Sequence, residues 1–157
     1  MTNHTVQLAS LYEADFCAWL QQQSQMLKEG RLADLDLENL LEELEALVRS
    51  EKRAFESNLR VLLQHLLKWH YQLDRRSNSW RATIREHQLR LRKQLEDSPS
   101  LKPYFYKVFA ETYQDARELA ALETGLPMDA FPIEAPYRVD QVLNESWVEG
   151  DREATLE

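Results

Sequence analysis

Three glutamates in the first third of the chain are the first residues whose spacing could support chemistry. Glu38, Glu42 and Glu45 fall on one face of a predicted helix, and such a cluster can bind a hard cation such as Mg²⁺ if further oxygen ligands join it. With His65, Glu42 and Glu45 would form the site of a metal-dependent hydrolase. The alternative, which we favour, is structural, because carboxylates in a first turn suit the helix dipole and the others pair with arginines or face solvent. We therefore expect no metal and no cofactor.

A row of arginines indicates a different chemistry. Arg81, Arg85 and Arg92 fall within about 60° of one another on a predicted helix, beside an apolar stripe that includes Trp80. Such a row can bind phosphates, with Trp80 or Trp69 available for stacking, or it can clamp carboxylates on a neighbouring helix. We define the predicted arginine face by six residues: Arg81, Arg85, Arg92, Trp80, Trp69 and His65.

The charge is segregated along the chain, although the net charge of −8 alone argues against a nucleic-acid binder. Residues 49–107 carry 14 Lys and Arg against 6 Asp and Glu, whereas residues 1–48 carry 2 against 9 and residues 108–157 carry 3 against 12. The basic middle segment is expected to pair internally with the acidic segments. Its exposure as a nucleic-acid-binding surface is the alternative.

The remaining motifs exclude the common enzyme classes. His65 and His70 are five residues apart and so point 140° apart on a helix, which prevents them from chelating one ion together. We interpret His65 as a partly buried residue that is hydrogen-bonded to a neighbouring helix. The three glycines are too scattered for a phosphate-binding loop, and the chain has no Glu-x-x-His, no HExxH and no nucleophile elbow. The sequence leans away from an enzyme.

The elements that position these residues are helices. The strongest apolar periodicity runs from Asp36, a good N-cap, to Gln72, as one helix or as two in tandem. We expect Gly30 and Gly125 to end helices and Ser98-Pro99 to open one. The predicted helices are 10–30 (capped by Ser10), 36–72, 80–96 (capped by Ser79), 98–125 and a short one over 139–144.

The C-terminal part of the chain is different in composition. Three prolines within residues 126–137 rule out a continuous helix there, and we expect an ordered strap laid over a helical bundle. Residues 149–157 read as a flexible acidic tail whose last two residues are typical of an expression vector. The predicted fold is all-α: a single-domain bundle of about five helices over residues 10–148, with a Leu-rich spine helix and the Pro-rich strap.

Length and composition fit one globular domain of 157 residues, 43% of them hydrophobic and 29% charged. Cys17 is the single cysteine, so no disulfide within the chain is expected. The N-terminal residues do not resemble a secretory signal, and no apolar run approaches the length of a membrane span. We expect a cytoplasmic protein that does not bind membranes.

Six short motifs together resemble domain-of-unknown-function family 29, which is bacterial and common in cyanobacteria. They lie in the expected order over about residues 10–148. The resemblance implies an all-helical single domain in the bacterial cytoplasm and no established activity, so no catalytic residue carries over. The motifs are Asp-Leu-Asp-Leu-Glu-Asn-Leu-Leu-Glu-Glu (34–43), Leu-Leu-Gln-His-Leu-Leu-Lys-Trp (62–69), Ser-Trp-Arg (79–81) with Ile84, Asp-Ser-Pro-Ser-Leu (97–101), Tyr-Gln-Asp-Ala-Arg (113–117) and Glu-Thr-Gly-Leu-Pro (123–127).

Taken together, these patterns leave the biochemical function unknown. The preferred hypothesis is a non-enzymatic protein–protein interaction or assembly module, acting by self-association or on another protein, because the long Leu-rich helix is accompanied by no catalytic constellation. A nucleic-acid-binding protein that uses the basic middle segment is the alternative, and a metal-dependent hydrolase is the third hypothesis.

Overall fold

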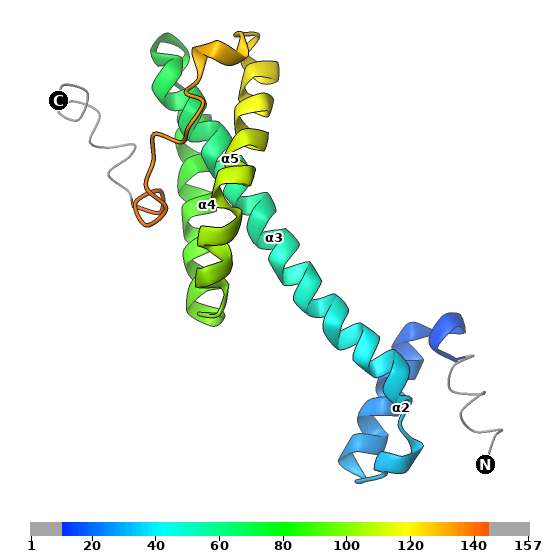
Figure 1. The fold of residues 1–157 in the computed structure, drawn as a ribbon. Helices are drawn as coiled ribbons and strands as arrows, with labels where there is room; N and C mark the ends of the chain where they lie inside the picture. The colour runs from blue at the N-terminus through cyan, green and yellow to red at the C-terminus, as the bar shows by residue number, and fades with distance from the viewer. Residues whose placement is uncertain (1–10, 145–157) are drawn as a thin grey trace. The chain divides into compact units, whose positions relative to one another are not determined.

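A computed structural model describes residues 11–144 and confirms the all-α prediction, with no β-strand among the described residues (Figure 1). By its contacts the chain divides into two compact units, Met1–Glu51 and Lys52–Glu157, which we describe separately as unit 1 and unit 2. A single domain over residues 10–148 stays a prediction. The predicted cap at Ser10 and the acidic tail at 149–157 lie outside the described residues.

Unit 1 contains α2 (Phe16–Lys28), and a separate helical turn over residues 11–14 precedes it. The predicted continuous helix from Ser10 is therefore wrong. Asp15 adopts a non-helical conformation and caps α2, its side chain accepting a hydrogen bond from the Ala18 N–H at 2.9 Å. Gly30 ends the helix as predicted, because its φ of +70° suits glycine and lets the next amide, that of Arg31, reach the Met26 carbonyl at 2.9 Å.

After the 3₁₀ turn η1 (Leu32–Asp34), α3 runs from Leu37 to Tyr71 as one helix of 35 residues. This length answers the question of one helix or two. Asp36 is the predicted N-cap, and its carboxylate accepts from the Asn39 N–H at 3.4 Å. The first turns of α3 belong to unit 1, and the rest of α3 begins unit 2.

Unit 2 packs the second half of α3 with α4 (Asn78–Asp97) and α5 (Leu101–Thr124). The 3₁₀ turn η2 (Leu73–Arg75) joins α3 to α4. The core is apolar and nearly closed to solvent, and the residues of α3 within it include six that are fully buried: Phe55, Leu59, Leu62, Leu63, Leu66 and Leu67.

Two of the predicted helix starts are wrong by a few residues. α4 begins after Ser77, whose hydroxyl accepts from the Trp80 N–H at 3.2 Å, and not after Ser79. Ser98 does not open α5, because its N–H is already bonded to Gln94 at the end of α4. α5 instead starts at Leu101 after a tight turn, and Gly125 ends it with a φ of +70°, as predicted.

Residues 126–144, which we call the strap, pass over α4 and α5 and include the 3₁₀ turn η3 (Met128–Ala130) (Figure 1). The predicted Pro-rich strap, 126–137, is the first part of this segment. Phe131 and Val142 are at most 1% exposed. Side chains of α5 hold the strap by its carbonyls: the Tyr113 hydroxyl donates to Pro132 at 2.7 Å, and the Arg117 Nε donates to Phe131 at 3.1 Å. The short helix predicted over 139–144 is wrong, because this segment forms a series of turns.

Candidate interaction face

α2 and the first half of α3 form a helical hairpin in unit 1. The Tyr12 hydroxyl, in the helical turn before α2, donates to Glu43 at 2.5 Å, whereas the Gln23 side chain in α2 accepts from the Asp36 N–H, just before α3, at 2.9 Å. As the chain advances from Tyr12 into α2, its contacts move back from Glu43 to Asp36, the residue before α3, so α2 and the start of α3 run antiparallel.

The interior of the hairpin is a polar network around the Asp36 carboxylate. The Trp19 indole donates to this carboxylate at 3.1 Å, and the Asn39 amide donates to it at 2.8 Å. Trp19 is fully buried and Gln23 is 1% exposed. A buried carboxylate needs such donors, and together they fix the register of the hairpin.

The first half of α3 has three distinct faces. One packs in the hairpin and carries the half-buried residues 39, 40, 43 and 46, and the next carries three glutamates with Arg49. The third face is apolar, and the exposed fraction of its side chains lies between 55% and 66%. Its residues recur at helical spacing: Leu37, Leu41, Leu44, Leu47 and Val48.

α2 exposes an apolar strip on the same side of the hairpin. In both helices the exposed residues follow packed residues by one position, as Leu20 follows Trp19 and Leu44 follows Glu43. Moving one position along a helix turns the direction of the side chain by 100° about the helix axis. Because the two helices run antiparallel, this turn points the exposed residues of both helices to the same side of the hairpin. We name the combined surface the hairpin apolar face: Phe16, Leu20 and Leu27 of α2 with Leu37, Leu41, Leu44, Leu47 and Val48 of α3.

The glutamates considered as metal ligands lie on the neighbouring charged face of α3. Arg49 donates to Glu42 at 2.8 Å and lies 4.0 Å from Glu45, so these carboxylates have a cationic partner on their own helix. Within residues 11–144 no group of three or more His, Cys, Asp or Glu could hold a metal ion. The hydrolase hypothesis stays a prediction.

The aromatic members of the predicted arginine face belong to the packing of unit 2. Trp69 is 9% exposed and lies in the core, and Trp80 packs against the core with the Lys68 ammonium 4.5 Å from its ring centre. His65 is half-buried, as predicted. Its Nδ1 lies 2.9 Å from the Val61 carbonyl on its own helix, not on a neighbouring one, and burial lowers the pKa of its imidazole.

The arginines of this face lie on α4, and part of the row binds the strap. Arg92 donates to the Leu143 carbonyl, and the buried Gln88 donates to the carbonyls of Val142 at 3.0 Å and Asn144 at 2.8 Å. The arginine row therefore lies on one surface of α4, and the strap covers part of that surface. A role of Arg81, Arg85 and Arg92 in binding stays a prediction.

An ion pair between α3 and α5 was not visible in the sequence. Lys68 is 7% exposed, and its ammonium donates to Glu123 at 2.6 Å. This hydrogen bond lowers the pKa of the Glu123 carboxyl. Since 55 residues separate the pair along the chain, only the packing of the helices reveals it.

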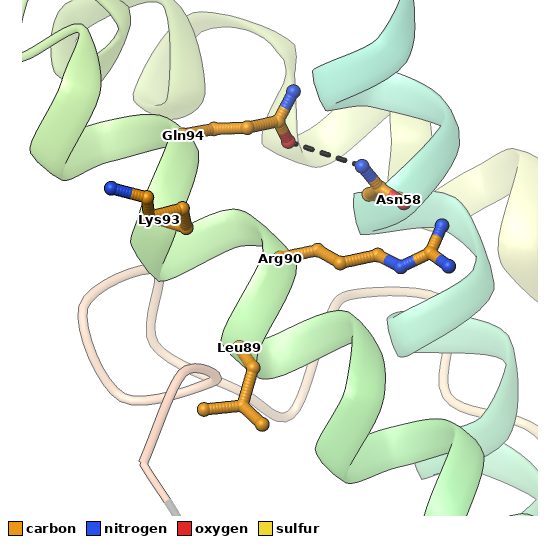
Figure 2. Close-up of a pocket in the computed structure, with 5 residues that line it drawn as sticks. All are labelled: Asn58, Leu89, Arg90, Lys93 and Gln94. Atoms are coloured by element: carbon orange, nitrogen blue, oxygen red, sulfur yellow. Dashed lines mark hydrogen bonds between the residues drawn. The ribbon is translucent and has the colours of Figure 1, made fainter.

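Unit 2 also has a hollow of about 530 Å³ between α3 and α4 (Figure 2). Its polar side chains bond to one another or to nearby carboxylates: Asn58 donates to Gln94 at 3.1 Å, and Arg90 donates to Glu86 at 2.5 Å. In Figure 2 Arg90 and Gln94 extend toward α3, whereas Lys93 points away from it. The hollow is shallow and open to solvent, whereas ligand pockets enclose most of the ligand, so it is a weak candidate.

None of the helices within residues 11–144 is both long and apolar enough to cross a membrane. Searches of curated proteins and of solved structures found no match. The chain does match a protein family, described as domain of unknown function DUF29, over residues 11–148. Since this match spans most of the 157 residues, the protein belongs to that family.

Proposed function

We propose that this protein is a non-enzymatic protein–protein interaction or assembly module and that the hairpin apolar face is its docking surface. The observation that carries the proposal is the face itself. Eight large apolar side chains on two adjacent helices are each between 40% and 66% exposed. Exposed apolar residues scattered singly need no explanation, whereas a contiguous apolar surface marks an interaction site.

The size of the face supports docking of a protein. Its eight side chains together present several hundred Å² of apolar surface, comparable to the ~800 Å² that one partner contributes to a standard interface. Covering a leucine of this kind contributes on the order of 1 kcal/mol, because roughly half of its surface is available for burial.

The polar network beneath the face supports the same function. Trp19, Gln23 and Asn39 are all tied to Asp36, so the two helices that carry the face are held in one register. A surface that is already ordered loses less conformational entropy on binding, which leaves more of the interaction energy for affinity. The expected cytoplasmic setting is part of this proposal.

The proposal is tested with the double variant Leu41→Asp/Leu44→Asp of the full chain. Its control is Leu73→Asp/Leu122→Asp, which places the same charges on apolar residues of unit 2 that are 65% and 73% exposed. The immobilised parent is challenged with an extract of the source cells and with a differently tagged copy of the chain. We expect at least one protein to be retained by the parent and the control, and its binding to the face variant to fall at least tenfold.

Circular dichroism and thermal melting establish that both variants stay helical. Equal retention by the face variant and the parent, or retention of no protein by the folded parent, would contradict the proposed function.

A further inference from the structure

We infer that the protein docked on the hairpin apolar face is a second copy of this chain, held antiparallel across a two-fold axis. The inference rests on the proposed function and names its partner. Its basis is the spacing and area of the face and the residues that flank it, since a surface that meets its own copy must be complementary to itself.

The spacing of the central apolar row is symmetric. Leu37, Leu41, Leu44 and Val48 are separated by four, three and four positions, which is the spacing of a coiled-coil seam and reads the same in both directions. A two-fold axis midway between residues 42 and 43 places Leu37 opposite the partner's Val48 and Leu41 opposite the partner's Leu44. Each large apolar side chain of the row then meets another.

The residues beside this row select the antiparallel orientation. Leu40 and Leu47 flank it on the side of α2, and Glu38 and Glu45 flank it on the other side. In an antiparallel pair each flank meets the same flank of the partner, so leucine meets leucine. The glutamates of both copies meet at the solvent-facing edge, where water screens their repulsion and Arg49 lies 4.0 Å from Glu45. In a parallel pair each flank meets the opposite one, which would place glutamates against leucines.

The strip on α2 extends the same interface. Because α2 lies on the leucine side of α3, an antiparallel pair brings the α2 helices of both copies to one side of the seam. Phe16, Leu20 and Leu27 then close over Leu40 and Leu47 of the two chains. The result is a four-helix arrangement with an apolar interior, and its area per chain is on the order of the ~800 Å² of a standard interface.

The mass of the full chain in solution is the first test. We expect sedimentation equilibrium to give a dimer, twice 18.6 kDa, for the parent and for Leu73→Asp/Leu122→Asp, and a monomer for Leu41→Asp/Leu44→Asp. A parent that stays monomeric at the highest soluble concentration would overturn the inference. The proposed function would nevertheless stand if the parent retained a different protein and Leu41→Asp/Leu44→Asp did not. Failure of the dimer and failure of the proposed function are therefore distinguishable.

The orientation is tested by pulsed electron paramagnetic resonance on the dimer. A nitroxide is attached at Glu51→Cys in a Cys17→Ser background, because Cys17 is exposed and would also react. With the axis between residues 42 and 43, antiparallel labels lie about 25 Å apart along the helices, whereas parallel labels lie about 10 Å apart. The long distance supports the antiparallel pair, and the short distance overturns it.

Discussion

The two halves of α3 share leucines at helical spacing but have opposite surroundings. Leu59, Leu62 and Leu66 in the second half are fully buried, whereas Leu37 and Leu44 in the first half are 66% and 61% exposed. Both halves carry leucines at helical spacing. The difference lies in the number of helices around each half: α4, α5 and the strap surround the second, and α2 packs against one side of the first.

The interiors of the two units differ in the same way. Unit 2 has an apolar core to which three helices and the strap contribute, whereas the hairpin of unit 1 is built around the carboxylate of Asp36. Apolar burial contributes most of the stability of a domain, and buried polar networks mainly specify one arrangement. We therefore expect unit 2 to supply most of the stability of the protein.

The largest expected effect contrasts one leucine from each half of α3. Leu62→Ala removes a fully buried side chain and should lower the free energy of unfolding by about 2–5 kcal/mol. Leu44→Ala shortens a side chain that is 61% exposed, and in the dilute protein it should change the free energy of unfolding by no more than about 0.5 kcal/mol. Urea denaturation followed by circular dichroism measures both.

Equal destabilisation by the two substitutions at high dilution would contradict this contrast, because Leu44 would then be buried in the isolated chain. A loss that appears for Leu44→Ala only as the protein concentration rises would instead reflect association through the hairpin apolar face.

The same contrast explains how much of the structure is predictable from the sequence. The bounds of α3 follow from the cap at Asp36 and from unbroken apolar periodicity, which are local properties of the chain. Whether its leucines are buried is not local, since the pattern is similar in both halves. Only the number of packed neighbours decides it.

The predicted arginine face shows the same limit. The positions of Trp69 and Trp80 on helices are correct, but their role as stacking platforms assumed exposure, and Trp69 is part of the core. The contacts of Gln88 and Arg92 with the strap join residues more than 50 positions apart. Helical spacing identifies which residues share a face and does not show what covers that face.

A smaller effect is expected at the ion pair that joins α3 to α5 in unit 2. Glu123→Gln removes the carboxylate that the buried Lys68 ammonium binds at 2.6 Å and should destabilise the protein by about 1–2 kcal/mol at neutral pH. Because the hydrogen bond from Lys68 lowers the pKa of Glu123 below its usual 4.5, the contribution is present above that pH and is lost as the pH falls through the lowered pKa.

Urea midpoints of the parent and of Glu123→Gln should therefore converge in acid and differ at neutral pH. The control is Glu118→Gln, an exposed carboxylate on the same helix, which should follow the parent throughout. If the difference in urea midpoint between the parent and Glu123→Gln persisted unchanged into acid, the charge of Glu123 would not be what stabilises the protein.

The smallest expected effect compares a glycine from each unit. Gly30 and Gly125 both have a φ of +70°, and no atom lies within 4 Å of the Cβ that alanine would add, so Gly→Ala introduces backbone strain without a clash. Each substitution should lower the free energy of unfolding by about 1 kcal/mol.

If the hairpin and unit 2 unfold together, both variants shift the urea transition equally. If the hairpin opens first, Gly30→Ala should leave the main transition unchanged and increase hydrogen exchange in α2 alone, whereas Gly125→Ala should shift the main transition. A main transition shifted by Gly30→Ala and not by Gly125→Ala would reverse the assignment of stability to unit 2.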